Sequence, residues 1–292
     1  GFLAEFVYLF RGIYGNSDIF YDVLYDRGTG SDNKLASINR SLQLDNYSRR
    51  MQLSFNRYKS GLEPDVIRSR EALKGDILAY FGAGEDDWRD VHWQMAHIVK
   101  DVKTLSALVS LDKDEISALR YAEKSRIPFQ ITPYYLSLFN KAGRNEHDRA
   151  VRAQVLPGKN YCRRITINRQ YGADLDFMGE KWTSPADGIT RRYPQILILK
   201  PYDSCPQICV YCQRNWEIKR VDEAKVTKEK VKKAIEWIRE NETITEVLVT
   251  GGDPLTLNDR YIGWLMDDLA SIGHVERIRI GTRIPVTLPY RI

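Results

Sequence analysis

Residues 203–214 read DSCPQICVYCQR and hold three of the four cysteines in this chain of 292 residues. Three residues separate Cys205 from Cys209, and two separate Cys209 from Cys212. Iron–sulfur clusters are usually held by four thiolates, one for each iron. Three thiolates on one short loop leave one iron of a four-iron cluster without a protein ligand. Such an open position is a place where a substrate or cofactor can bind and react.

A disulfide framework and a structural zinc site are the less specific interpretations of these cysteines. Three close cysteines and the distant Cys162 are too sparse for a disulfide framework in a chain of this length. A structural zinc site normally takes four Cys or His ligands. The nearest candidates for a fourth ligand are Cys162 and His274, and neither has zinc-finger spacing. We therefore expect a cluster, and we expect Cys162 to be a small buried side chain.

The spacing of Cys205, Cys209 and Cys212 resembles the signature of radical S-adenosylmethionine (SAM) enzymes, as does the aromatic Tyr211 before the last cysteine. The resemblance implies that the three cysteines bind a [4Fe–4S] cluster, whose open iron chelates the amino and carboxylate groups of SAM. It further implies that one electron from the reduced cluster cleaves the sulfonium of SAM and gives a 5′-deoxyadenosyl radical. A reductant such as flavodoxin or ferredoxin would supply that electron.

Five further motifs between about Asp86 and Ile292 resemble the lysine 2,3-aminomutase family in their order and spacing. They are WR at 88–89, ITPYYLSL at 131–138, RYP at 192–194, GGDPL at 251–255 and RIGTRIP at 279–285. The resemblance implies an isomerase that moves an amino group between carbons 2 and 3 of an amino acid. In this family pyridoxal phosphate (PLP) holds the migrating amine, so PLP is a third expected cofactor.

The resemblance also assigns the contacts of SAM. Tyr211 lies where the superfamily often places an aromatic ring beside the adenine, with core packing as the alternative role. Gly251, Gly252 and Asp253 match the segment that contacts the methionine amino group of SAM. Because glycine has no Cβ, this segment can approach a ligand closely. Gly-Gly-Asp is also common turn chemistry, so the assignment depends on its place after a predicted strand.

Arg214 matches the family arginine that grips the carboxylate of the amino-acid substrate. A guanidinium suits this task because it forms a bidentate pair with a carboxylate. Arg192 and Tyr193 match positions that contact PLP in the family. These three residues are therefore the expected substrate and PLP contacts.

Three positions depart from the family pattern, because Ile196, Asn215 and Trp216 stand where the family has basic residues. These departures keep open a radical SAM protein without PLP that acts on another substrate. A third hypothesis is a non-catalytic iron–sulfur or zinc-binding module. The PLP-binding lysine of the family lies beyond the segment that corresponds to Ile292, as do the acidic residues for the distal amine of the substrate.

From residue 191 onward the sequence alternates predicted strands and helices. The strands are ILIL at 196–199, EVLVT at 246–250 and IRIG at 278–281, and the continuous apolar run of the first is typical of a strand covered on both faces. The helices are residues 226–242, capped by Thr227, and the segment capped by Asn258. This order predicts a right-handed parallel α/β unit with its active groups at the carboxyl ends of the strands.

The resemblance implies a six-stranded partial (β/α) TIM-like barrel of the radical SAM type, of which these would be the first three strands. An open edge on the third strand would be an aggregation hazard. We therefore expect either further chain after Ile292 or another element that covers this edge.

A mainly helical N-terminal region precedes the barrel. We expect a helical extension over 1–85, a helical family-specific region over 86–190 that packs on the barrel, and the first half of the barrel over 191–292. Helical periodicity favours helices near residues 2–10, 48–58 and 65–80, with a partner-binding arm as the alternative to a plain extension. Asp112 with Glu115 predicts a capped helix start, and Thr132 before a proline predicts another.

The amino-acid composition limits the classes of molecule that this protein is expected to bind. The content of 43% hydrophobic and 28% charged residues is typical of a soluble globular protein. The net charge of +5 permits anionic ligands, but no basic stripe interleaved with aromatics points to nucleic acid. No apolar run approaches the roughly 20 residues of a membrane span, and the N-terminus lacks signal-peptide features. We expect a cytoplasmic homo-oligomer that acts on a small-molecule amino acid, with no membrane partner.

Overall fold

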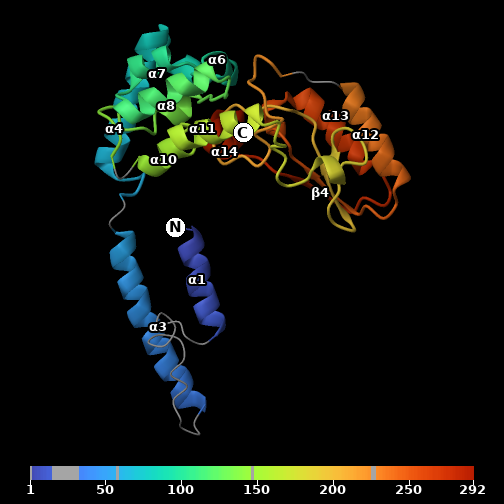
Figure 1. Ribbon diagram of the computed structural model, residues 1–292, viewed down its shortest axis with the longest axis horizontal. Helices are drawn as coiled ribbons and strands as arrows, with labels where there is room; N and C mark the ends of the chain where they lie inside the picture. Colours follow the sequence, from blue (N-terminus) through green and yellow to red (C-terminus); the bar gives the residue numbers. More distant parts are fainter. Residues whose placement is uncertain (1, 15–32, 57–58, 146–147, 225–227) are drawn as a thin grey trace. The chain divides into compact units, whose positions relative to one another are not determined.

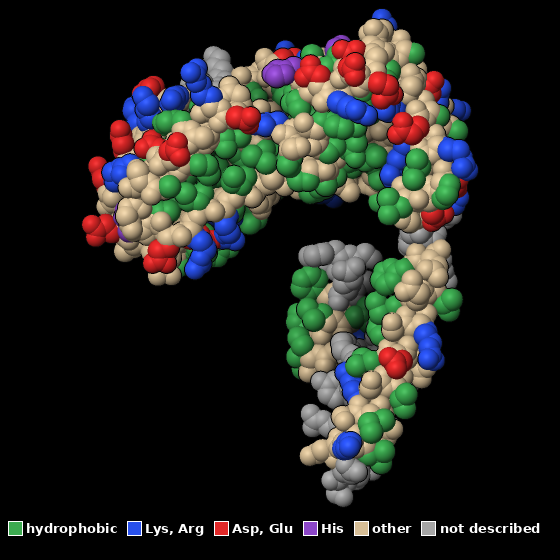
Figure 2. All heavy atoms as spheres, turned by 180° about the vertical axis from the view of Figure 1, so that it is seen from behind, with side chains coloured by type: hydrophobic (Ala, Val, Ile, Leu, Met, Phe, Trp, Pro, Cys, Tyr) green, Lys and Arg blue, Asp and Glu red, His purple; other side chains and the backbone are tan. Residues whose placement is uncertain are grey.

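The computed structural model describes residues 2–14, 33–56, 59–145, 148–224 and 228–292 (Figure 1). The chain forms two compact units, residues 1–63 and 64–292. The described helices of the first unit are α1 (Phe2–Ile13) and α3 (Asn33–Phe55), which contain the segments expected to be helical near 2–10 and most of 48–58. Many of their apolar side chains are exposed, and Figure 2 shows them distributed along both helices. None of the helices in the described ranges is long and apolar enough to span a membrane.

The second unit begins with a helical layer. Its helices are α4 (Pro64–Phe81), α5 (Glu85–Arg89), α6 (Val91–Ala96), α7 (Val102–Leu108), α8 (Lys113–Lys124), α9 (Pro133–Leu136), α10 (Arg149–Ala153) and α11 (Lys159–Gln170). Leu73 and Ile77 of α4 are fully buried in the same core as Leu105 and Leu119. The division between the two compact units falls at residue 63, because α4 packs into this layer. The expected domain boundaries at 85 and 190 stay predictions.

The predicted helix starts are present. The Asp112 carboxylate accepts the N–H of Glu115 at 2.8 Å, and the Glu115 carboxylate accepts the N–H of Asp112 at 3.0 Å, which forms a capping box on α8. The hydroxyl of Thr132 accepts the N–H of Tyr135 at the start of α9, where Pro133 occupies the first turn. Both helices begin where the local sequence predicts.

Helices α8 and α11 pack side by side and run in the same direction. The Sγ of Cys162 lies 3.8 Å from the carbonyl oxygen of Ala118. About two turns further along both helices, Nη1 of Arg169 lies 3.0 Å from the carbonyl oxygen of Ser125. Cys162 is buried between them, as expected. Tyr161 and Ile165 of α11 line one small cavity together with Ile208, so α11 adjoins residues 203–214.

A four-stranded open sheet follows, with the order β1 (Ile189–Thr190), β2 (Ile196–Leu199), β3 (Glu246–Val249) and β4 (Arg277–Ile280). Strands β2, β3 and β4 are parallel and confirm the three predicted strands. Strand β1 pairs antiparallel with β2. It was not predicted, because a strand of two residues is too short to show the alternation of apolar and polar residues that marks a strand in a sequence. The partial barrel stays a prediction, since the described residues form an open α/β sheet.

Helices α12 (Lys228–Glu240) and α13 (Asp259–Ala270) cover one face of the sheet (Figure 1). Leu197 and Leu199 of β2 are buried under them, while Ile196 and Ile198 are only half-buried. The expectation that this strand is covered on both faces was therefore wrong among the described residues. Asn258 caps α13 as predicted, and Thr227 lies outside the described residues.

Short helices complete the fold: η1 (Lys181–Thr183), η2 (Pro254–Thr256), α14 (Ile284–Thr287) and η3 (Pro289–Arg291). The last two return to the helical layer. The indole N–H of the buried Trp88 donates to the hydroxyl of Tyr290 at 3.0 Å, and the hydroxyl of Thr132 donates to the carbonyl of Thr287. The helical layer and the sheet are thus joined by polar contacts as well as by chain connectivity.

A buried arginine stabilises the helical layer. Arg152 on α10 is 1% exposed, and its Nε lies 2.6 Å from the Oδ2 of Asp148. Its Nη2 donates to the carbonyl of Asn140 at 2.7 Å, and its Nη1 lies 3.4 Å from the Oε2 of Glu115. The guanidinium therefore joins three segments of this layer.

We predict that Arg152→Ala lowers the free energy of unfolding by about 3 kcal/mol, because it leaves buried carboxylates without their cation. The matched variant Arg149→Ala, in the same helix but at an exposed side chain, should change it by less than about 0.5 kcal/mol. Urea denaturation followed by circular dichroism measures both. Equal effects of the two substitutions would contradict a structural role for Arg152.

Candidate active site

The cysteine loop, residues 203–214, follows β2 and packs on the segment after β3. The N–H of Gly252 donates to the carbonyl of Tyr202, and the N–H of Asp253 donates to that of Ser204, both at 2.8 Å. A Cβ on Gly252 would lie 2.1 Å from the Ser204 carbonyl oxygen, so no larger residue fits. Gly251 adopts a φ of 127°, which favours glycine. Both glycines therefore bring two loop backbones together, a reason for Gly-Gly that the sequence did not reveal.

A pocket of about 160 Å³ lies where the loops after β2, β3 and β4 meet. Its lining includes Cys205 and Cys209 from the cysteine loop, Gly252 and Asp253 after β3, and Thr282 and Arg283 after β4. The carboxyl ends of parallel strands lie at one edge of a sheet, which explains why these loops converge. Two of the three predicted cluster ligands and two of the predicted SAM contacts are thus brought together.

The three cysteines are free thiols that influence one another electrostatically. Burial raises the pKa of Cys205, and the nearby Asp253, Cys212 and Cys209 raise it further by charge repulsion. Burial is also the largest cause of the raised pKa of Cys212. Three thiolates in such a site would repel one another unless a cationic centre bound them. The donor set therefore fits an iron–sulfur cluster.

A single-ion site is not formed. Among the residues that the structure describes, no three His, Cys, Asp or Glu side chains are arranged to hold one metal ion. Both candidates for a fourth zinc ligand lie elsewhere, because Cys162 Sγ faces the carbonyl of Ala118 and His274 Nε2 faces that of Ile238. A four-iron cluster does not need its thiolates around one point, since each cysteine binds a different iron.

Asp253 joins the segments after β3 and β4. Its side chain is 4% exposed, and it accepts the hydroxyl of Thr282 at 2.6 Å and the N–H of Arg283 at 2.7 Å. Burial raises the pKa of Asp253, and these hydrogen bonds oppose that effect because they stabilise the carboxylate. A buried acceptor at the pocket wall is thereby held in a defined orientation.

Arg283 is a site residue to which sequence reasoning assigned no role. Its guanidinium donates to the Sγ of Cys209 and, at 2.9 Å, to the Oε1 of Gln154. It also lies 5.5 Å from the ring centre of Tyr211, whose side chain is 61% exposed. The sequence feature that could have identified Arg283 as a site residue is its position after the third predicted strand, inside the RIGTRIP motif.

The helical layer holds the cysteine loop from the opposite side. The side chain of Gln130, which is fully buried, donates to the carbonyl of Cys205, and the N–H of Ile208 donates back to the Gln130 carbonyl at 3.2 Å. The N–H of Val210 donates to the carbonyl of Gln154 at 2.8 Å. The loop is therefore fixed between the sheet and the helices.

The predicted substrate and PLP arginines meet in a buried charge cluster. Arg214 Nε donates to Glu180 Oε2 at 2.9 Å, and both side chains are buried. Arg192 Nη2 lies 3.5 Å from the other oxygen of Glu180, and Lys200 Nζ lies 3.5 Å from Oε2. Glu217 adds a second carboxylate at 3.1 Å from Lys200. Three cations thus surround one buried carboxylate that the sequence analysis did not identify.

The remaining predicted residues lie away from this cluster or at its margin. Tyr193 is 59% exposed, and Ile196 is a half-buried residue at the start of β2. The amide of Asn215 donates to the hydroxyl of Tyr161 at 3.2 Å, so it turns toward α11. The ring of Trp216 lies 5.0 Å from the ammonium of Lys181. The departures from the family pattern therefore make contacts of their own.

Comparison with known proteins agrees with this geometry. A family model described as the radical SAM superfamily matches residues 199–291. An uncharacterized KamA family protein of Methanocaldococcus jannaschii is 37% identical over 312 aligned positions, which cover 100% of this chain and 50% of that protein. The glutamate 2,3-aminomutase of Clostridioides difficile is 38% identical over 232 positions, covering 80% of this chain and 52% of the relative.

The L-lysine 2,3-aminomutase of Clostridium subterminale is 35% identical over 228 positions, which cover 78% of this chain and 51% of that enzyme. The chain thus spans about half the length of the curated relatives that it matches. The alignments with the two aminomutases cover 80% and 78% of this chain. They must therefore include most of the second unit, residues 64–292.

We predict that Gly252→Ala destabilises the fold by about 2 kcal/mol and removes most of the bound iron after reconstitution, because the new Cβ displaces the cysteine loop. Gly263→Ala is the matched control, since no atom lies within 4 Å of its added Cβ, and it should stabilise α13 by about 1 kcal/mol. Iron content and urea denaturation report the two effects. Full iron content in Gly252→Ala would show that the loop contact is dispensable.

We also predict that Glu180→Gln lowers the free energy of unfolding by about 3 kcal/mol, because three cations lose their shared buried charge. Glu217→Gln provides the control, since its carboxylate is more exposed, and it should cost less than about 1 kcal/mol. Thermal or urea denaturation distinguishes them. The interpretation fails if the Glu217 variant is the less stable of the two.

Proposed function

Because the chain belongs to the radical SAM superfamily and to its aminomutase family, we propose that Cys205, Cys209 and Cys212 hold a [4Fe–4S] cluster that cleaves SAM reductively. The observation that carries this proposal is the pocket at the carboxyl ends of three parallel strands, into which Cys205 and Cys209 open beside Asp253. When bound, the cluster and SAM supply a 5′-deoxyadenosyl radical. The proposed overall reaction is a 2,3-migration of an amino group on an amino acid.

Asp253 is the proposed acceptor for the ammonium group of SAM. A carboxylate offers about four acceptor positions. Thr282 and the N–H of Leu255 donate to Oδ1, and the N–H of Arg283 donates to Oδ2. These donors orient the carboxylate at the wall of the pocket, where a charged donor can approach it. Gly252 beside it contributes pocket wall without a side chain, so that a ligand can reach the backbone.

Tyr211 is the proposed contact of the adenine. Its ring is largely exposed, although it is anchored through a hydroxyl hydrogen bond to Gln154 Oε1 at 3.4 Å. An aromatic ring held at one end offers a flat apolar surface for stacking. The guanidinium of Arg283 near this ring and near Cys209 supplies positive charge at the same edge of the pocket.

Arg214 is proposed to bind the substrate carboxylate, and Arg192 and Tyr193 are proposed to contact PLP. Glu180 accepts from the Nε of Arg214, the nitrogen that a bidentate pair through the two Nη groups does not need. Arg192, Lys200 and Arg214 outnumber the two carboxylates of this cluster. The excess positive charge supports a further anion there, such as a carboxylate or a phosphate.

A radical SAM protein without PLP is the second candidate. It is favoured by Asn215 and Trp216, which pack toward Tyr161 and Lys181 and add no basic group to the Arg214 cluster. Such a protein would cleave SAM but show no absorbance band of bound PLP. Titration with PLP of the anaerobic protein, including any chain that follows Ile292, therefore separates the two candidates, and it leaves the SAM-cleavage proposal untouched.

The central test is anaerobic reconstitution with iron and sulfide, followed by reduction with dithionite in the presence of SAM. We expect a brown protein with the electron paramagnetic resonance spectrum of a four-iron centre, and we expect 5′-deoxyadenosine and methionine as products. Cys205→Ala, Cys209→Ala and Cys212→Ala should each abolish SAM cleavage.

Cys162→Ala provides the internal control, because this fourth cysteine is buried between α8 and α11 and faces away from the loop. It should retain the iron and the cleavage activity. A protein that binds iron but leaves SAM intact would indicate a non-catalytic module. Zinc without iron would indicate a structural metal site.

A further inference from the structure

Gln207 lies within the cysteine loop, midway between Cys205 and Cys209, and it is 2% exposed. Among the described residues, neither Nε2 nor Oε1 of its side chain has a hydrogen-bond partner. A buried polar group without a partner costs stability, so such a group in a folded protein calls for a ligand, an ion or a water. Gln207 also lines the pocket of about 160 Å³ to which Cys205 and Cys209 belong. A ligand in this pocket is therefore a candidate partner of the amide.

The phenol of Tyr135 lies near the Gln207 amide but does not satisfy it. Burial raises the pKa of Tyr135 to about 12, and the nearby amide opposes that rise. The hydroxyl of Tyr135 donates its own proton to the carbonyl of Val151 at 3.1 Å, so it could only accept from the amide. An amide offers two N–H donors and a carbonyl acceptor. Because the charge of Cys209 acts on the same phenol, the amide and this sulfur share one neighbourhood.

Arg283 is a second N–H donor at the same cysteine. Its guanidinium donates to the Sγ of Cys209 and, at 2.9 Å, to the Oε1 of Gln154 in the helical layer. The backbone N–H of Arg283 is held by the Asp253 carboxylate. A guanidinium carries five N–H donors, so the contact with Gln154 leaves donors free for sulfur. Arg283 is thus fixed from two sides and directed at Cys209.

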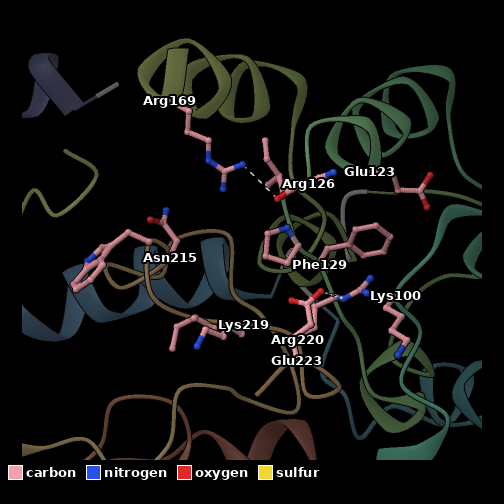
Figure 3. A pocket seen from close by; sticks show the side chains of 13 residues that line it. Lys100, Glu123, Arg126, Phe129, Arg169, Asn215, Lys219, Arg220 and Glu223 are labelled. Atoms are coloured by element: carbon pink, nitrogen blue, oxygen red, sulfur yellow. Dashed lines mark hydrogen bonds and ion pairs between the residues drawn. The ribbon is translucent and has the colours of Figure 1, made fainter. Parts of the chain in front are cut away.

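The larger hollow beside the cysteine loop gives no comparable sign of a ligand. Its volume is about 470 Å³, and Figure 3 shows basic side chains around it. Three of these cations already have acidic partners. The ion pairs join Lys100 to Asp222, Lys219 to Asp203, and Arg220 to Glu223. A fourth, Arg169, donates to the carbonyls at the end of α8, so little unbalanced charge remains there.

We propose that Gln207 and Arg283 donate N–H hydrogen bonds to sulfur atoms of the bound cluster and thereby raise its reduction potential. The inference rests on the proposed function, because it needs the cluster held by Cys205, Cys209 and Cys212. Reduction adds one electron to the cluster and makes its sulfur atoms more negative. Hydrogen bonds to these atoms therefore stabilise the reduced form more than the oxidised form, which is one way in which proteins set such potentials.

A buried water is the alternative partner of the Gln207 amide, since buried waters commonly satisfy such groups. A water bound there would stabilise the metal-free fold and would leave the potential of the cluster unchanged. The two possibilities therefore differ in two measurable quantities, the reduction potential of the loaded protein and the stability of the metal-free protein.

The first test is a redox titration of the anaerobically reconstituted protein, followed by the electron paramagnetic resonance signal of the reduced cluster. Gln207→Met keeps the approximate shape of the side chain but removes its donors. It should shift the one-electron equilibrium about tenfold toward the oxidised form, which lowers the midpoint potential by about 59 mV. Gln213→Met is the matched control, the same substitution at an exposed position of the same loop, and it should leave the potential unchanged.

Arg283→Met tests the second donor in the same way and should also lower the midpoint potential by about 59 mV or more, a tenfold shift. Arg279→Met is its control, because it removes the same charge from the preceding strand, where Arg279 pairs with Glu246 instead of with a cysteine. It should leave the potential unchanged.

The second test is urea denaturation of the metal-free protein. An amide that lacks a partner without the cluster predicts that Gln207→Met is at least as stable as the unaltered protein, because the substitution removes an unpaired polar group. A clear loss of stability would indicate a bound water or another structural partner and would overturn the assignment of Gln207. Unchanged potentials in both variants, or equal shifts in their controls, would overturn the proposal as a whole. Failure of the proposed function would appear separately, as an unaltered protein without a four-iron signal.

Discussion

The backbone of Gly252 packs directly on the backbone of Ser204, and the rest of the site depends on this contact. Strands β2 and β3 are parallel, so the loops after them leave the sheet at the same edge and compete for the same space. Because residue 252 has no side chain, the N–H of Asp253 can reach the cysteine loop. Asp253 then holds Thr282 and Arg283. Three loops that are distant in sequence become one hydrogen-bonded wall.

The helical layer supplies the second constraint. Gln130 and Gln154 hold the cysteine loop through its backbone, and Gln154 also accepts from the guanidinium of Arg283. Fixed backbone on both sides limits how far the three thiols can move apart. Such preorganisation means that little order has to be gained when a cofactor binds.

The features that could be predicted from the sequence are those that depend on residues close together in the chain. The capping box of Asp112, the three parallel strands and the position of the cysteine loop all follow from local spacing. The partners of the site residues could not be predicted in this way, because they are distant: Glu180 lies 34 residues before Arg214, and Gln130 lies 75 residues before Cys205. An isolated polar residue in a segment without periodicity gives no signal of burial. A resemblance names positions, but it did not reveal the carboxylate between two arginines.

The contact between Trp88 and Tyr290 has a consequence for how the protein is made. The two residues are separated by 202 positions. A ribosome adds about 5–20 residues per second, so Tyr290 is synthesised roughly 10–40 seconds after Trp88. Thr287 is likewise synthesised well after Thr132, to which it is hydrogen-bonded in the folded protein. During this interval the nascent helical layer exposes surface that is later covered, which makes it a natural client for chaperones that bind apolar segments as they emerge.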